Sequence, residues 1–390
     1  FRNMTLHNYH PKILEFLYQL TKLDRFMSYR EIANHITISG KKVNPKTIQK
    51  YFKFLKRPYN HPKSITKNKF DYYPSPVYEK LGLMELCVLS EGVKFNEMPI
   101  LSNKNYIGWL YNPRYNKHTL ITKYLIPPKK LGKFEIIFNK LKYKSVISDF
   151  KFYLAHSGFT IYSKFDKTID KSGNFIYENN DYDEINNQIF NFKTYLKSTE
   201  EVNILDKIKK NPLIIPVLFE YQYEFYSSID VWNKLKLKLN NDVWLYFRKF
   251  KRKSDFIGIK KVQNTLSDIK NLNLYNQIRV IYVPLEVEKN FIIYAFIDFK
   301  NKENLLKNIK EFALHCILLR ISPIDKNKAL IAAVINNETL QIIFSLLEKL
   351  KIEKFYFLDY NKSFEVFTDK KYYKFDYSKL FDPKKLKWLI

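Results

Sequence analysis

Residues 44–55 read NPKTIQKYFKFL, and this stretch decides how the beginning of the chain folds. Asn44 followed by Pro45 is typical of a helix start, because Asn caps the first turn and Pro is tolerated at the first helical position. Apolar side chains then recur at the spacing of one helical face, at Ile48, Tyr51, Phe52 and Leu55. We therefore predict a helix with one buried face and one basic face.

Two further helices are predicted upstream of this one. Residues 10–20 begin with His-Pro and carry apolar side chains at helical spacing. Residues 28–31 read SYRE, which matches the capping box in which the first and last residues satisfy each other's free backbone amides. The helix that starts there carries Ala33 on its apolar face. A small side chain at this position allows the next helix to pack closely against it. Three helices in this order predict a tri-helical module.

The polar face of the third predicted helix is basic, as a recognition helix requires, since one face must pack while the other reaches bases or phosphates. A Lys-rich polar ribbon follows Pro58 and is predicted to be a wing. The candidate DNA contacts of this module are Arg30, Lys41, Lys42, Lys46, Thr47, Gln49, Lys50, Lys53, Arg57, Lys63, Lys67 and Lys69.

The formal net charge of +28 is concentrated in two stretches. Residues 1–70 contain fifteen Lys and Arg against three acids, and residues 231–262 contain ten against two. A Lys-rich composition inherited from the genome would spread evenly along the chain. An anionic membrane surface would favour one long basic amphipathic helix. The clustering instead indicates a phosphate-binding surface, and hence nucleic acid.

Residues 29–33 (YREIA) followed by residues 45–55 resemble the winged helix-turn-helix of archaeal and bacterial transcription regulators, including the Lrp/AsnC type. The resemblance covers roughly residues 10–73 and implies contact with DNA. Tri-helical modules also serve in replication initiators and in protein contacts, so a docking role stays open.

Residues 81–165 change to short β-rich runs around one helical run, a pattern that predicts a small α+β domain. A domain of this kind directly after a winged helix resembles the ligand-sensing and dimerisation domain of Lrp/AsnC regulators, which is ferredoxin-like. The Gly-and-Asp-containing turn motif of that family is not found, so the resemblance does not extend to amino-acid sensing.

The second half of the chain partly repeats the first. Residues 212–252 predict three more helices. The last of them ends with YFRKFKR at 246–252, which is similar to YFKFLKR at 51–57. Residues 278–359 then read as β-β-α-β-β-α-β. We infer a tandem duplication, with chance recurrence of an aromatic-basic string as the alternative. Further candidate DNA contacts are Arg248, Lys249, Arg252 and Lys253.

The predicted fold class is therefore α+β, with a winged helix-turn-helix and a ferredoxin-like domain, repeated in the C-terminal half. The predicted domains are a winged helix at 1–74, an α+β domain at 75–170, a polar linker at 171–202, a second helical, winged-helix-like domain at 203–274 and a second α+β domain at 275–390.

Residue types that would carry catalysis are scattered. Only eight glycines are present, and no glycine-rich phosphate loop occurs. The histidines lack partners at metal-ligand spacing, and Cys87 and Cys316 are expected to be reduced and buried. Asp181, Asp183 and Glu184 fall in the predicted linker, which they would keep solvated. We therefore expect no catalytic residue, no cofactor, no metal and no enzymatic activity.

The function expected from these patterns is that of a DNA-binding transcription regulator or an architectural DNA-binding protein. Its expected partners are double-stranded DNA, a second copy or an intramolecular pseudo-dimer, and the transcription machinery. No long apolar run or secretory signal is seen, so a cytoplasmic, nucleoid-associated location without membrane contact is expected. The alternatives are a replication or recombination initiator, a docking scaffold, and single-strand binding by aromatic stacking.

Overall fold

The computed structural model describes most of the chain, with gaps. The described residues are 10–23, 28–55, 71–94, 97, 108–111, 118–170, 176, 182–198, 204, 208, 210–223, 228–238, 255–281, 290–358, 381–382, 385 and 387–388.

The first helical module, residues 10–55, contains the three helices that the sequence predicts and a hairpin that it does not. Its elements are α1 (Pro11–Thr21), α2 (Tyr29–His35), β1 (Thr37–Ile38), β2 (Lys41–Lys42) and α3 (Pro45–Leu55). The capping box at Ser28 and Glu31 is present in full. The hairpin turns at Ser39 and Gly40, whose φ values of 51° and 69° are those of a two-residue turn between antiparallel strands. The hairpin therefore separates α2 from α3.

The first sheet has four antiparallel strands in the order β5-β6-β4-β7. They are β4 (Met84–Glu91), β5 (Gly108–Tyr111), β6 (Leu120–Ile126) and β7 (Asp149–Ala155). Helix α4 (Leu131–Tyr143), preceded by the short η2 (Pro128–Lys130), covers one face. Phe138 of α4 packs edge-on against Phe152 of β7, with the ring centroids 5.4 Å apart. Burial of this aromatic face holds α4 on the sheet.

The second sheet has the order β13-β10-β12-β11-β8. Four strands come from the second half of the chain: β10 (Asn290–Asp298), β11 (Leu318–Pro323), β12 (Lys328–Asn336) and β13 (Lys351–Leu358). Helices α12 (Lys302–Ala313) and α13 (Leu340–Glu348) alternate with them. The fifth strand, β8 (Phe159–Tyr162), comes from the first half and pairs with β11. The predicted domain at 75–170 is therefore not self-contained, because its last strand extends the other sheet.

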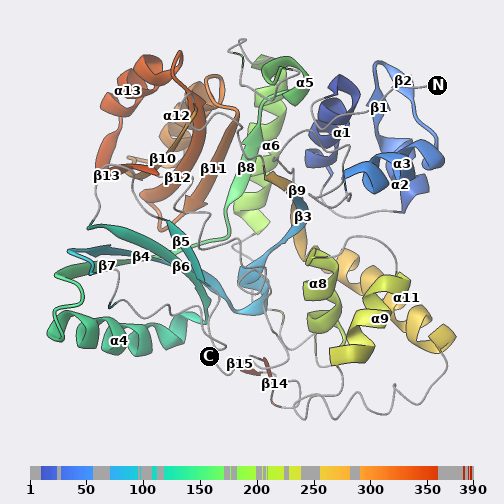
Figure 1. Ribbon diagram of the computed structural model, residues 1–390, viewed down its shortest axis with the longest axis horizontal. Coiled ribbons are helices and arrows are strands. Elements are labelled where there is room, and N and C mark those ends of the chain that lie inside the picture. Colours follow the sequence, from blue (N-terminus) through green and yellow to red (C-terminus); the bar gives the residue numbers. More distant parts are fainter. Residues whose placement is uncertain are drawn as a thin grey trace.

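The two sheets pack against each other through the faces that the helices leave bare (Figure 1). Tyr153 of the first sheet stacks on Phe296 of the second, with the ring centroids 4.1 Å apart. The other buried members of this layer are Cys87, Leu89, Ile121, Tyr294 and Leu330. In Figure 1, α4 lies on the outer side of the first sheet, and α12 and α13 lie on the outer side of the second. We call the space between the two sheets the seam.

Two strands outside the sheets join the halves of the molecule. β3 (Asp71–Pro76) follows the first helical module, and β9 (Tyr275–Ile281) follows a second one; the two strands pair antiparallel with each other. The described helices of the second helical module, residues 210–274, are α8 (Ile214–Tyr223), α9 (Ser228–Lys238) and α11 (Asp255–Asn271).

Each helical module packs on the strand that follows the other module. Ile278 of β9 donates its amide to the Leu23 carbonyl in the first module (2.9 Å), whereas α8 of the second module contacts β3. The helix that the sequence predicts at 241–252 lies outside the described residues. Helix α11 was not predicted.

The predicted linker at 171–202 is wrong over half of its length. Residues Tyr182–Ser198 form helix α6, which packs on the core of the second sheet. Ile185, Phe192 and Leu196 are buried there, at a spacing that places them on one helical face. The acidic residues at its start give this stretch the composition of a solvated linker, although it carries an apolar stripe. Short helix α5 (Phe165–Thr168) precedes it and packs against α1.

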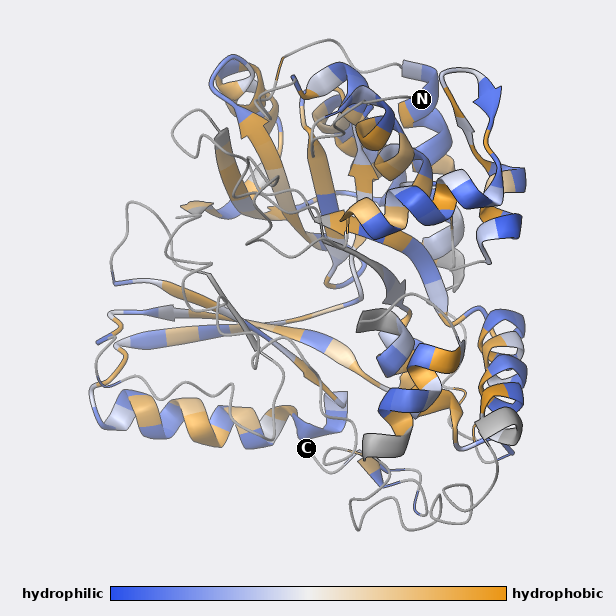
Figure 2. Ribbon diagram, turned by 45° about the vertical axis from the view of Figure 1, so that its right-hand side comes forward, coloured by the Kyte–Doolittle hydropathy of each residue, from blue (hydrophilic) through white to orange (hydrophobic). Residues whose placement is uncertain are grey.

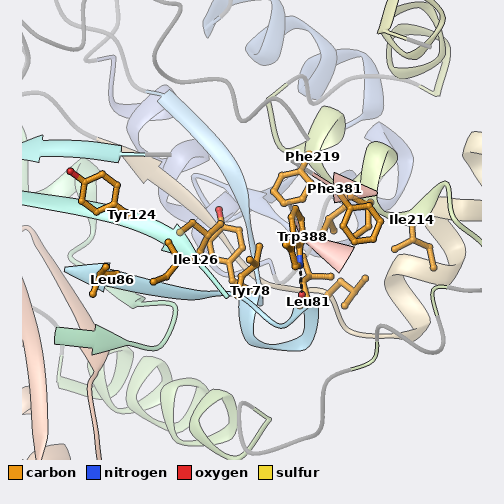
Figure 3. Close-up of a cluster of buried hydrophobic side chains, with 14 of the residues drawn as sticks. Tyr78, Leu81, Leu86, Tyr124, Ile126, Ile214, Phe219, Phe381 and Trp388 are labelled. Carbon is orange, nitrogen blue, oxygen red and sulfur yellow. Dashed lines mark hydrogen bonds between the residues drawn. The ribbon is translucent and has the colours of Figure 1, made fainter. Parts of the chain in front are cut away.

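The end of the chain ties the second helical module to the first sheet (Figure 3). Strands β14 (Phe381–Asp382) and β15 (Lys387–Trp388) form a short pair. The Trp388 indole packs against Phe219 and Phe381, and its Nε1 donates to the Leu81 carbonyl at the end of η1 (Tyr78–Leu81), at 2.8 Å.

The hydropathy of the chain follows this layering (Figure 2). The strands of both sheets are mainly hydrophobic, whereas α4 carries hydrophobic and hydrophilic residues along its length. Among the described helices, none combines the length and the apolar character that crossing a membrane would require.

Candidate nucleic-acid interface

Helix α3 is fixed by its cap and by its buried face. The Asn44 side chain accepts from the Thr47 amide (2.8 Å) and from the Thr47 hydroxyl (3.1 Å), so the predicted cap is confirmed. Ile48, Tyr51 and Phe52 are buried against α1, where Phe16 lies 5.1 Å from the Tyr51 ring and 5.2 Å from the Phe52 ring. This packing fixes which side of α3 faces outward.

The outward side of α3 gathers the predicted contacts of this helix. Lys46, Gln49, Lys50 and Lys53 are exposed, and Thr47 is half-buried beside its cap. Residues 32–55, all of which the structure describes, contain five Lys and no Asp or Glu. The local potential of this surface is therefore positive, which favours phosphate groups.

The hairpin places two more predicted contacts at the surface. Lys41 and Lys42 of β2 are exposed. The Ser39 amide in the turn donates to both Glu15 carboxylate oxygens on α1, each at 2.9 Å, and this contact anchors the hairpin. Arg30 is exposed on α2, next to the capping box.

Both acidic residues described in this module have structural roles. Glu31 accepts from the Ser28 amide at 2.8 Å, and Glu15 holds the hairpin. Burial, and then the Glu15 carboxylate, raise the pKa of Tyr51, which keeps that phenol neutral. The acidic groups of the module therefore sit at helix and hairpin junctions, whereas the exposed face of α3 carries only polar and basic side chains.

The remaining predicted contacts lie outside the described residues. They are Arg57, Lys63, Lys67, Lys69, Arg248, Lys249, Arg252 and Lys253. The described parts of the second helical module do show where that module lies. Figure 1 places α8, α9 and α11 on the same side of the two sheets as α1, α2 and α3. Burial, and then the Asp230 carboxylate of α9, raise the pKa of Tyr29 on α2, because the two modules approach each other here.

Of the acidic residues that were predicted to lie in a linker, Glu184 contacts the first helical module. Glu184 on α6 accepts from the Tyr18 hydroxyl through Oε2 and pairs with Lys22 through Oε1, both at 3.0 Å. Asp183 lies in the first turn of α6. Glu184 therefore connects α6 to α1.

Side chains typical of metal sites or reactive thiols are not grouped in the described part of the chain. No cluster of three or more His, Cys, Asp or Glu there could hold a metal ion. Cys87 and Cys316 are buried free thiols, and burial raises the pKa of Cys87 to about 12. A thiol with such a pKa stays protonated and is a poor nucleophile.

A buried group of charged residues lies at one end of the seam, and the sequence reasoning missed it. Glu85 of β4 pairs with Lys123 of β6 at 3.3 Å and with Arg320 of β11 across the two sheets. Arg279 of β9 donates to the Gly158 carbonyl in the loop between β7 and β8. We call Glu85, Lys123, Arg279 and Arg320 the seam cluster.

The seam cluster perturbs the pKa values of its own members. Burial raises the pKa of Glu85, but Arg320, Lys123 and Arg279 outweigh it and hold this pKa at about 2. Burial, and then Arg320, lower the pKa of Lys123 to about 8, although Glu85 opposes the shift. The sequence did offer one signal for this cluster: Glu85 and Lys123 are each charged residues within an otherwise apolar strand. A charged residue in such a position is normally paired, so it predicts a buried partner.

No family model matches this chain, and no curated protein matches it either. Among solved structures, similarity is found to crystal structures of the siroheme decarboxylase NirDL, one of them in complex with an iron-uroporphyrin III analogue. These are 12% and 11% identical to this chain, with TM-scores of 0.43 and 0.42. Each match covers 89% of this chain and 90% of the other.

These matches correct one expectation. The expectation that the chain has no enzymatic activity is contradicted, because the solved structures that match are those of an enzyme. Similarity at this level assigns neither an activity nor a substrate to this chain.

Proposed function

We propose that this chain binds double-stranded DNA through the exposed face of α3 and acts as a transcription regulator or an architectural protein on DNA. The observation that carries the proposal is the division of α3. One face is buried through Ile48, Tyr51 and Phe52, while the opposite face exposes Lys46, Gln49 and Lys50. The Gln49 amide can form hydrogen bonds with a base edge, and the Lys46 and Lys50 ammonium groups can bind phosphates on either side of it.

We further propose that the fold is a duplicated pair of winged helix and ferredoxin-like domain. The four strands of the second sheet from the C-terminal half follow a β-α-β-β-α-β chain order with the spatial order fourth, first, third, second, which is the ferredoxin-like arrangement. The first sheet has the same spatial order, with α4 as its second helix. Residues 95–107, between β4 and β5, lie almost entirely outside the described residues.

The pairing of β3 with β9 supports a pseudo-twofold relation between the halves. Each strand follows a helical module and leads into a sheet, and the two strands run antiparallel. An antiparallel pair of equivalent strands is what a local twofold axis produces. The two helical modules of the single chain would then contact one duplex together, in the way that the two DNA-binding modules of a dimer contact two half-sites.

The test of this function is duplex binding by a triple variant on α3. Replacing Lys46, Gln49 and Lys50 with Ala removes two charges and one amide from the exposed face. The matched control replaces Lys133, Asn139 and Lys140 of α4 with Ala, which removes the same chemical groups from an exposed face far from α3 in Figure 1. We expect the α3 variant to lose at least tenfold in affinity for duplex DNA, with the control unchanged. Equal losses in both variants would leave only non-specific attraction to a basic protein and would overturn the assignment to α3.

A further inference from the structure

The seam cluster holds more positive than negative charge in a buried place. Lys123 is 1% exposed, Arg279 is 5% exposed, and the one carboxylate among the four residues, Glu85, is 2% exposed. Both oxygens of Glu85 are engaged, Oε2 by Lys123 and Oε1 by Arg320. Arg279 therefore has no carboxylate of its own within the cluster.

The next carboxylate along the seam is also engaged elsewhere. Glu79 accepts from the Ser157 hydroxyl at 2.8 Å and from the Ser157 amide, and it lies 3.4 Å from Nδ1 of His156. Buried charges in proteins are normally paired or bound to an ion of opposite sign, because an isolated buried charge is costly. Among the described residues, Arg279 is the cation of the cluster to which neither Glu85 nor Glu79 is paired.

Arg279 has donor capacity left for such an anion. In the described part of the chain it makes no ion pair, and its buried Nε has no hydrogen-bond partner. Ser75 of β3 lies opposite Gln277 of β9, so Ser75, Gln277 and Arg279 share one face of the two-stranded ribbon. The Ser75 hydroxyl is buried and likewise has no partner among the described residues.

This end of the seam reaches solvent. The Arg320 side chain is 21% exposed and the His156 side chain is 32% exposed, while the members of the cluster behind them are buried. The cluster therefore borders solvent through the Arg320 side chain.

We propose that the seam cluster binds one small oxyanion, a carboxylate or a phosphate group, with Arg279 as its principal ligand and the Ser75 hydroxyl as a further donor. A guanidinium group presents its N–H donors in a plane that matches the oxygens of such groups. The bound anion would pair with the buried Arg279 guanidinium. This site lies in the seam, away from α3, and does not depend on the proposed function.

The experiment uses the full chain without DNA, with sodium acetate and sodium phosphate as separate probes. Thermal unfolding and titration calorimetry are measured at constant ionic strength, with sodium chloride as the balancing salt. We expect a saturable rise in Tm and binding of one equivalent of at least one probe. Saturation by acetate alone would identify a carboxylate site, and saturation by phosphate alone would identify a phosphate site.

Variants connect the effect to the proposed ligands. Arg279→Met should weaken anion binding at least tenfold, and Ser75→Ala should weaken it several-fold. Lys354→Met is the matched control, because Lys354 pairs with Glu91 in a partly exposed part of the seam away from Arg279. If Arg279→Met does not fold, Ser75→Ala and the wild-type saturation decide the matter. A rise in Tm that does not saturate, and that is equal in Ser75→Ala, Lys354→Met and wild type, is a general salt effect and overturns the proposal.

Discussion

Glu85 and Arg320, which are 235 positions apart in the chain, form an ion pair that joins the first sheet to the second. The carboxylate is almost fully buried, and it also pairs with Lys123 on its own sheet. This contact couples the packing of the two sheets to the charge state of one carboxyl group. The stability of the molecule should therefore depend on pH in a way that a single substitution can isolate.

Loss of the Glu85 charge should destabilise the fold. Glu85→Gln removes the carboxylate and leaves Lys123 and Arg320 buried without it, which costs on the order of 3 kcal/mol in the free energy of unfolding. Because the pKa of Glu85 is held at about 2 in the folded state, below its ordinary value of 4.5, its stabilising contribution is complete above pH 4.5 and is lost as the pH falls toward 2. Urea unfolding between pH 6 and pH 3 should show a steeper loss for wild type than for Glu85→Gln. Parallel curves for the two proteins would contradict this role.

Lys123 should add a second dependence on pH, of the same sign as that of Glu85 but in the alkaline range. Its pKa is lowered from 10.5 to about 8 by burial and by Arg320, so between these values the unfolded chain holds a proton that the folded chain has lost. The free energy of unfolding contributed by this residue therefore rises with pH over that window. The difference between wild type and Lys123→Met should increase in favour of wild type from pH 7.5 to pH 10, because exposed Lys and Tyr residues titrate alike in both proteins. A constant difference would mean that Lys123 keeps its proton.

The closely packed Gly158 should not tolerate a side chain. A Cβ atom at this position would lie 2.4 Å from Nε of Arg320 and 2.5 Å from the Ser322 hydroxyl oxygen. Gly158→Ala must therefore displace Arg320 and weaken its pair with Glu85, at a cost of about 1–3 kcal/mol. Gly132→Ala on α4 is the control, because a Cβ there meets no atom within 4 Å. A Gly158→Ala protein as stable as wild type would show that Arg320 can move freely.

The chain end should contribute to stability through Trp388. This side chain is 3% exposed, and it packs with Phe219 and Phe381 in the cluster of Figure 3. Trp388→Ala should lower the free energy of unfolding by about 3–5 kcal/mol. Trp388→Phe keeps most of the apolar contact and loses only the hydrogen bond to Leu81, so it should cost about 1 kcal/mol. Chemical denaturation of both variants measures the difference, and similar losses would indicate that packing is not what holds this end.

The parts of the fold that the sequence predicts best are those with local signals. The cap at Asn44 and the box at Ser28 and Glu31 are confirmed, because a cap involves residues only three positions apart. The strands that the second half of the chain gives to the second sheet also follow the element order predicted over residues 278–359, since each is an apolar run bounded by polar residues.

The parts that the sequence does not predict depend on contacts between distant segments. β8 follows the strands of the first sheet in the chain, yet it pairs with β11, more than 150 residues later. Helix α6 carries a clear apolar stripe, but its polar surroundings favoured a linker. The seam cluster brings together residues from four separate strands, and no local sequence pattern predicts that these residues are in contact.

The most direct measurement of the central claim is the salt dependence of binding to a DNA duplex. Each phosphate contact removed lowers the slope of log affinity against log salt concentration by about one unit. Wild type and the α3 variant with Lys46, Gln49 and Lys50 replaced by Ala should differ by about two units in this slope, and the α4 control variant should match wild type. Identical slopes and affinities in all three proteins would contradict duplex binding through α3.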